Sequence, residues 1–288
     1  MPSLKEVKTR INSVNSTRKI TSAMKMVASA KLHAAQRAIE GMHPYEQRLT
    51  HIMKMFLNSL DGDVASVYSR EPAEVKRVAI VLLTSNTSLC GAFNGNAIKE
   101  FRQKVDDYRA KGIEVAAVHA IGKKGAEAVG KLGLSSPDYS KLLDQASYEA
   151  MATLAHELMA QFEAGEIDRV ELIYHKFISA GTQQLRSEQF LPMKLEKGEA
   201  TYGIQLDYIV EPGKGELIEQ LIPKALCLKL FTVLLDSLAS EHATRVIAMQ
   251  VATDNANELL EELTLLYNKS RQQAITAELL DIVGGSMA

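Results

Sequence analysis

The feature that most constrains this chain is a run of helix-forming residues at its C-terminal end. Residues 240–285 contain no proline and no glycine before Gly284, and Leu, Ala, Glu and Gln dominate. Helix-compatible sequence begins near Gly215, so the predicted helix approaches seventy residues, roughly 100 Å at about 1.5 Å per residue. Helices in globular domains average about 12 residues. This length therefore predicts a shaft, a spacer or one half of a coiled coil.

A second long helix is predicted at the N-terminal end, from Ser3 to about Leu60. Ser3 and Glu6 have the spacing of a capping box. The apolar residues that follow step by three and four, as in a coiled coil: Leu4, Val7, Ile11 and Val14. The sequence thus predicts one long helix at each end of the chain.

Two irregularities are expected in the N-terminal helix. Its apolar stripe changes phase to Ile20, Met24 and Val27, and such a shift locally alters a supercoil. Further along, Gly41 and Pro44 are expected to kink or briefly break the helix.

The middle of the chain alternates predicted strands and helices. The segment Lys76–Thr84 is a continuous, β-branched apolar run, typical of a strand covered on both faces. Further strands are expected at residues 113–119, 170–177 and 183–191, and helices at about residues 96–111, 123–131 and 148–163. This alternation predicts a Rossmann-like α/β domain with a largely parallel sheet.

The predicted fold class is α/β plus long helices. It comprises an N-terminal coiled-coil helix (1–60), a central α/β domain (61–212) and a C-terminal coiled-coil helix (213–288), entered through the turn 211–215. Neither terminal helix can pack on the α/β domain along its whole length, so we expect them to pair as an antiparallel coiled coil. Their charges favour this pairing, because residues 1–60 carry a net +7 and residues 241–288 a net −4.

No catalytic, cofactor-binding or metal site is evident. The loop Ser85–Asn94 follows a strand and precedes a helix, where phosphate loops lie, but it has neither GxGxxG nor GxxxxGK[ST]. A tight turn is favoured there over nucleotide binding. The histidines form no HExxH pair, and Cys90 and Cys227 have no ligand spacing. We therefore expect no catalytic residue, no cofactor and no metal, and a reducing compartment.

The chain is expected to be soluble, since its N-terminus lacks the apolar core of a signal peptide and residues 217–238 are interrupted by charges. The basic face of residues 5–37 fits nucleic-acid phosphates, an acidic protein surface or simply solvent. A coiled-coil adaptor or nucleic-acid-binding module is therefore the alternative. A nucleotide-dependent enzyme is a third reading, which lacks a phosphate loop.

Three stretches carry a resemblance to a known family. The sequence LKEVKTRINSVNSTRKITSAMKMVASAKL at residues 4–32 closely resembles the N-terminal signature of the gamma subunit of F-type ATP synthases. TSNTSLCGAFN at residues 84–94 resembles that family's central loop, and residues 240–285, ending in ITAELLDIVGG, resemble its terminal signature. The matches follow the family's order and span essentially the whole chain.

The resemblance implies a central-stalk rotor with no active site of its own. In this family the paired helices turn inside an alternating hexamer of alpha and beta subunits. The α/β domain lies against the epsilon subunit and the membrane c-ring. Proton flow turns the ring and the rotor, which drives the beta subunits through their conformations during ATP synthesis or hydrolysis. Such a chain would be peripheral, on the cytoplasmic face of a bacterial plasma (inner) membrane.

The resemblance also assigns residues to two contact surfaces. Contacts with the beta subunits are implied for five residues: Met24, Lys25, Arg245, Arg271 and Gln272. Contacts of the foot with the c-ring are implied for three: Lys31, Tyr208 and Glu211. Arginine suits carboxylate partners because its guanidinium can bind them in a bidentate manner.

The chain departs from the family pattern at a few positions. Asn86-Thr87-Ser88 stands where Asp-Arg-Gly is usual, Val210 where an aromatic residue is common, and Ser286 where alanine is usual. No regulatory insertion with cysteines is visible, so the thiol switch of the chloroplast branch is not expected.

Overall fold

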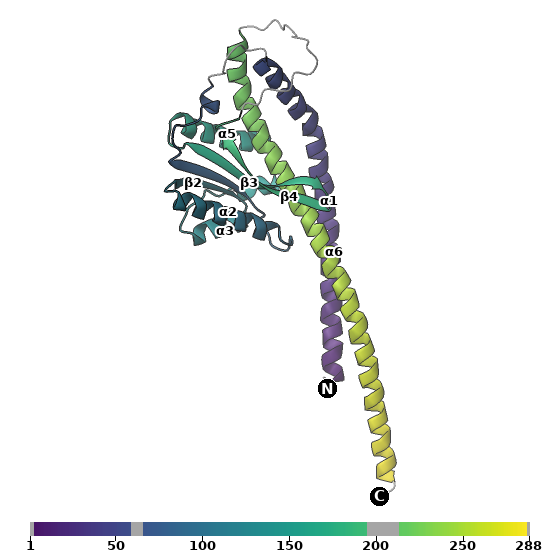
Figure 1. Cartoon of the computed structure of the whole chain (residues 1–288). Helices are drawn as coiled ribbons and strands as arrows, with labels where there is room; N and C mark the ends of the chain where they lie inside the picture. The colour runs from purple at the N-terminus through teal and green to yellow at the C-terminus, as the bar shows by residue number, and fades with distance from the viewer. Residues whose placement is uncertain (1–2, 59–65, 195–212, 287–288) are drawn as a thin grey trace. The chain divides into compact units, whose positions relative to one another are not determined.

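The computed structural model describes residues 3–58, 66–194 and 213–286 (Figure 1). The chain divides into two compact units, one formed by residues 31–244 and the other by residues 1–30 together with residues 245–288. Two helices contribute to both units, α1 (Leu4–Asn58) and α6 (Lys214–Ser286). α6 has 73 residues, which confirms the long C-terminal helix.

α1 continues through the positions where a break was expected. It has 55 residues and contains Pro44. Of the kink or short break expected at Gly41 and Pro44, the break is therefore wrong, and the kink stays a prediction. A proline inside a helix removes one backbone donor and costs about 3 kcal/mol. The surrounding turns are packed against the core of residues 31–244 through Met42 and Leu49, among others. This burial offsets the local cost of the proline.

Residues 31–244 hold a four-stranded sheet. Its strands and smaller helices are η1 (Val67–Ser69), β1 (Arg77–Leu83), α2 (Phe93–Ala110), β2 (Glu114–Ile121), α3 (Lys123–Lys131), α4 (Ser140–Asp144), α5 (Tyr148–Glu163), β3 (Arg169–Ser179) and β4 (Thr182–Leu191). The strand order is β2-β1-β3-β4. β1 pairs in parallel with β2 and β3, and β4 pairs antiparallel with β3. The predicted α/β fold with a largely parallel sheet is confirmed.

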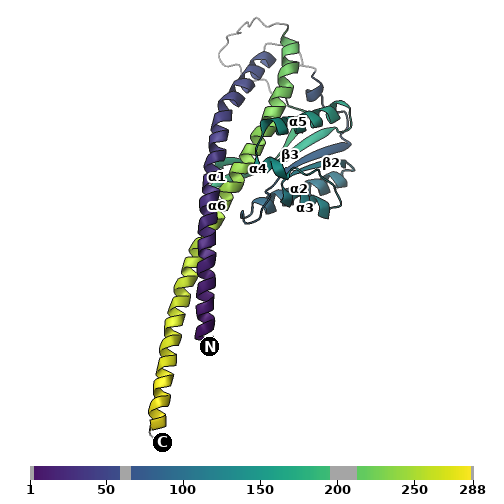
Figure 2. The same ribbon diagram turned by 180° about the vertical axis from the view of Figure 1, so that it is seen from behind.

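Alternate residues of β1 pack into two separate apolar cores, one on each face of the sheet, because successive side chains of a strand point to opposite faces. Ile80 and its same-face neighbours pack with Phe101 of α2 and Val129 of α3. Val81 and its neighbours, on the other face, pack with Leu158 of α5 and Leu234 of α6. Figures 1 and 2 show α2 and α3 on one side of the sheet and α5 on the other. The sheet is therefore covered on both faces, which explains the continuous apolar sequence of its central strand.

Local signals explain several boundaries, and a few were not predicted. Ser147 caps α5, because its side-chain oxygen accepts the N–H of Ala150 at 3.5 Å. α2 begins at Phe93 rather than near Asn96, and α4 had no periodic signal that could predict it. Among the described residues, no helix is both long enough and apolar enough to cross a bilayer.

Candidate interaction surface of the paired helices

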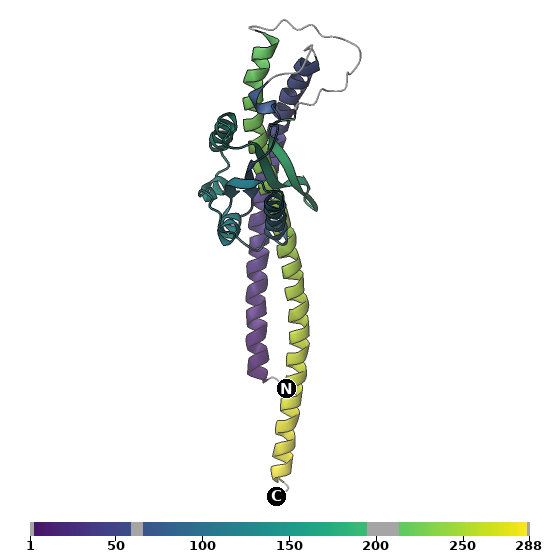
Figure 3. The ribbon, with the colours of Figure 1, turned by 60° about the vertical axis from the view of Figure 1, so that its left-hand side comes forward.

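In the unit formed by residues 1–30 and 245–288, α1 and α6 lie side by side and antiparallel (Figure 3). Among the described residues, three polar pairs connect them. Arg18 Nη1 donates to Asn257 Oδ1 at 3.4 Å, the Oγ1 atoms of Thr21 and Thr253 lie 2.8 Å apart, and Lys25 Nζ donates to Gln250 Oε1. Residue numbers rise on α1 as they fall on α6. The antiparallel pairing predicted from the sequence is therefore present.

The seam between the two helices keeps one phase along α1. The buried residues are Val7, Thr21 and Ala28, spaced by multiples of seven. The predicted change of phase is wrong, because Ile20 and Val27 are each 59% exposed. The polar residues of the three pairs occupy the seam instead, since α6 offers them hydrogen-bonding partners there.

Sequence reasoning missed the polar residues of α6, although a signal for them exists. On α1 the paired residues are spaced by three and then four: Arg18, Thr21 and Lys25. On α6 the same spacing recurs: Gln250, Thr253 and Asn257. Two polar trios with matching spacing on two helices expected to pair predict cross-helix hydrogen bonds.

Lys25 and Met24, two of the residues implied to contact beta subunits, are both half-buried. The Gln250 side chain that accepts from Lys25 also donates to both carboxylate oxygens of Asp254, at 2.9 and 2.8 Å. The amide thus lies between an ammonium and a carboxylate, which defines its orientation. Lys25 takes part in a contact within the helix pair, and a lysine has three N–H donors, so this contact leaves its charge able to attract an acidic partner.

The other implied contact residues of α6 differ in exposure. Arg245 is only 8% exposed, and it already has an interaction partner within the chain. Arg271 and Gln272 are exposed. These two residues present a guanidinium and an amide to solvent, as a recognition surface for carboxylates or backbone groups requires.

The C-terminal end of α6 extends beyond the N-terminal end of α1 (Figure 1). Large apolar side chains are exposed along this extension: Ile275, Leu279, Leu280, Ile282 and Val283. An apolar patch of this kind on a helix marks a surface for interaction with another protein.

The implied foot residues lie elsewhere in the chain. Lys31 is an exposed residue of α1. Tyr208 and Glu211 lie outside the described residues, as do Val210 and the start of the turn 211–215. Their predicted contacts therefore stay predictions.

The loop Ser85–Asn94 is a compact βα turn closed by its own side chains. Asn94 Oδ1 accepts the N–H of Ser85 at 2.9 Å, and Asn94 Nδ2 donates to Ser85 Oγ at 2.7 Å and to Cys90 Sγ at 3.2 Å. Phe93, at the start of α2, stacks on the buried ring of His175 with ring centroids 4.4 Å apart. These contacts close the loop on itself, as expected for a tight turn.

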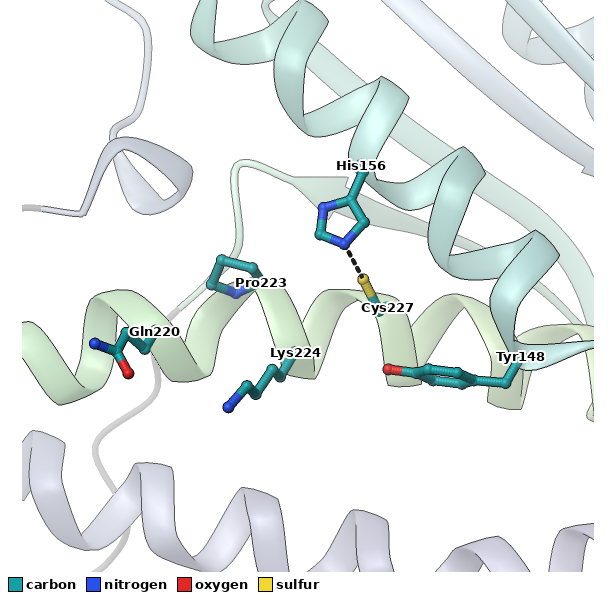
Figure 4. Close-up of a pocket in the computed structure, with 6 residues that line it drawn as sticks. All are labelled: Tyr148, His156, Gln220, Pro223, Lys224 and Cys227. Carbon is teal, nitrogen blue, oxygen red and sulfur yellow. Dashed lines mark hydrogen bonds between the residues drawn. The ribbon is translucent and has the colours of Figure 1, made fainter.

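His175 and Cys227 are buried groups that the sequence did not single out for a role. Burial lowers the pKa of His175 to about 4 and raises the pKa of the Cys227 thiol. Cys227 Sγ lies 3.6 Å from His156 Nε2 beside a cavity of about 330 Å³ between α5 and α6 (Figure 4). A protonated thiol in this setting is a weak hydrogen-bonding group. Within the described part of the chain, His, Cys, Asp and Glu form no cluster of three suited to a metal.

Comparison with known proteins agrees with this geometry. The family model described as ATP synthase matches residues 3–288. An ATP synthase gamma chain of Phocaeicola vulgatus is 57% identical over 291 residues, and one of Bacteroides fragilis is 58% identical over 292 residues; each alignment covers 100% of both chains. The chain belongs to the ATP synthase gamma chain family.

Solved structures resemble this gamma-family chain in fold. A chain in the structure of the Euglena gracilis mitochondrial ATP synthase, OSCP/F1/c-ring, in rotational state 3, has a TM-score of 0.66 at 22% identity, covering 99% of this chain and 93% of that one. A chain in the rotor structure of the same synthase, in rotational state 1, has a TM-score of 0.63 at 20% identity, covering 94% and 98%. The fold expected from the resemblance is therefore confirmed.

Proposed function

We propose that this chain is the central-stalk rotor subunit of a proton-translocating F-type ATP synthase. The observation that carries the proposal is full-length similarity to gamma chains, combined with two long helices paired antiparallel. Such a subunit couples rotation of the membrane c-ring to conformational cycling of the catalytic beta subunits. The reading as an adaptor or nucleic-acid-binding module is not favoured, because the full-length relatives are gamma chains.

The helix pair has the properties that a shaft needs. Paired helices are stiff along their axis, and the exposed apolar end of α6 can turn within an apolar sleeve without strong, angle-specific ion pairs. Arg271 and Gln272 would supply the angle dependence, through contacts with a beta subunit that differ from one rotor angle to another. A partner shifts a conformational equilibrium only by its differential affinity for the two states.

The remaining partners follow from the same assignment. Alpha and beta subunits would surround the helix pair, with Met24, Lys25 and Arg245 contributing to the contacts. Lys31, Tyr208 and Glu211 would contribute to a foot next to the c-ring, and epsilon would bind the α/β domain. The chain would then be peripheral, on the cytoplasmic face of a bacterial inner membrane, which the bacterial sources of its relatives support.

Reconstitution tests this proposal. The full chain is mixed with alpha and beta subunits from the same source, and the complex is isolated and assayed for ATP hydrolysis. We expect a single copy of this chain per alternating hexamer and hydrolysis that depends on it. A variant that lacks residues 275–288, which include the exposed apolar side chains at the end of α6, serves as the control and should bind more weakly. A chain that stays unbound, or that binds DNA with a steep salt dependence, would overturn the proposal.

A further inference from the structure

Two stripes on α1 compete for the seam of the helix pair. The first stripe consists of Arg18, Thr21 and Lys25. The second consists of Ile20, Met24 and Val27, and its residues Ile20 and Met24 directly precede Thr21 and Lys25. A shift of one residue corresponds to a rotation of about 100° around the helix axis. Hydrophobicity alone favours burial of the second stripe, because it removes more apolar surface from water.

The structure shows the opposite setting. Thr21 is 9% exposed, whereas Ile20 and Val27 are each 59% exposed and Met24 is half-buried. Arg18 and Lys25, which flank Thr21, are half-buried. The less apolar stripe therefore occupies the seam.

Hydrogen bonding across the seam accounts for this choice. Each of the three seam residues of α1 meets a matching polar side chain of α6, at Asn257, Thr253 and Gln250. An α1 helix rotated by about 100° would leave those three half-buried side chains facing apolar groups, and a polar group that is shielded from water without a partner is unfavourable. Polar residues in the seam of a coiled coil commonly select one pairing over others in this way.

We propose that Arg18, Thr21 and Lys25 are positioning residues that fix the rotational setting of α1 against α6. By occupying the seam, they keep Ile20 and Val27 on the surface of the helix pair. Asp254 supports the arrangement, because it orients the Gln250 amide with its oxygen toward Lys25. The inference concerns the helix pair itself and does not depend on the proposed rotor function.

Disulfide trapping in the full chain tests the setting. Thr21→Cys with Thr253→Cys reports the observed setting, since the two replaced hydroxyl oxygens lie 2.8 Å apart. Ile20→Cys with Thr253→Cys reports the competing one. Yields are compared after mild oxidation, by mass analysis of the linked peptides. Cys90 and Cys227 can stay, because both are buried.

The decisive measurement repeats both cysteine pairs in a variant that also carries Asn257→Leu and Gln250→Leu. These two changes remove the partners of Arg18 and Lys25. We expect the ratio of the first yield to the second to fall by about tenfold, the size of effect that loss of a charge-assisted hydrogen bond produces. The conservative variant Gln250→Glu, which offers Lys25 a carboxylate, should preserve the ratio. An unchanged ratio in the leucine background would overturn the proposal.

A matched control introduces two leucines in place of polar residues of α6 that lie outside the seam, at the exposed residues Asn255 and Asn268. Asn255→Leu with Asn268→Leu should leave the ratio unchanged, and an equal fall there would also overturn the proposal. Circular dichroism checks that each variant keeps its helix content. If the double leucine variant loses it, Gln250→Leu alone is measured, and an unchanged ratio in that variant counts against the proposal. The measurement uses the isolated chain, so a failure of complex assembly does not affect it.

Discussion

The seam of the helix pair and the sheet core of residues 31–244 are built on different principles. All six residues Val78–Leu83 of the central strand are fully buried and apolar, and they meet apolar side chains on both faces. The seam of the pair contains buried apolar residues such as Val7 and Ala28, but also a threonine, a lysine and an arginine that meet polar side chains. The first region gains its stability from the area that it buries, and the second gains its specificity from the pairs that it forms.

The difference predicts where substitutions are costly. A close-packed apolar core responds to lost volume, because its surroundings relax only partly. In a half-exposed polar seam, stability falls more when one partner of a hydrogen-bonded pair is removed than when both partners are replaced by apolar groups. Four experiments, from the largest expected effect to the smallest, test this contrast.

The largest effect is expected from Phe101→Ala in the sheet core. Phe101 is fully buried between α2 and the sheet. Its truncation should lower the free energy of unfolding of the α/β unit by about 3–5 kcal/mol. Denaturant titration followed by circular dichroism measures this value. Gln103→Ala, an exposed change on the same helix, should stay within about 0.5 kcal/mol, and similar losses for both variants would contradict the contrast.

A smaller effect, opposite in sign, is expected from Asp236→Asn. Burial raises the pKa of Asp236 to about 6, and Glu46 adds to the rise, while Lys176 and Lys229 oppose it. Since the folded pKa exceeds the unfolded one, the acid's stabilising contribution is fully present below about pH 4 and is lost as pH rises through about 6. The substitution should therefore raise the free energy of unfolding by about 1–3 kcal/mol at neutral pH.

The pH profile of Asp236→Asn separates this effect from a general one. Denaturant titrations at about pH 4 and pH 7.5 should give a gain only at the higher value. Asp106→Asn, at an exposed position, is the matched control and should show little gain at either pH. A gain of equal size at both values would show that the buried charge is not its cause.

The seam itself is tested by Thr21→Val and Thr253→Val, alone and together. Each threonine hydroxyl also lies near a backbone carbonyl of its own helix, Thr21 near that of Arg18 at 3.0 Å and Thr253 near that of Met249 at 2.7 Å. A hydroxyl has one hydrogen, so one threonine donates across the seam and the other donates to its own helix. We expect each single change to cost up to about 1 kcal/mol and the double change to cost less than their sum. Thr264→Val, at an exposed position on α6, is the control. Strict additivity would mean that the two hydroxyl groups do not interact.

The smallest effect on stability is expected from Arg271→Ala and Gln272→Ala. Both side chains are exposed, so the free energy of unfolding of the isolated chain should change by less than about 0.5 kcal/mol. Assembly with alpha and beta subunits, or hydrolysis by the complex, should fall severalfold. Lys269→Ala, an exposed neighbour, serves as the control for both readouts. A loss of about 2–5 kcal/mol, as for a core leucine, would contradict the assignment of these residues to a partner surface.

Much of the fold was predictable because its signals are local and long. The strands and α5 were predicted within a few residues, since apolar runs and helical periodicity report burial directly. The expected break at Pro44 was wrong because packing against the core of residues 31–244 outweighs a local preference. The division into segments 1–60, 61–212 and 213–288 stays a prediction, as do the contacts of Tyr208 and Glu211.

The sequence by itself determined the long helices, their antiparallel pairing, the α/β unit and the family. Each follows from composition, period, charge or motif over many residues, so no single position decides it. Only the tertiary structure decided which face of α1 enters the seam and which charged residues are engaged within it. Those outcomes depend on what lies opposite each residue, as Gln250 lies opposite Lys25, and a hydrophobic pattern on one helix does not contain that information.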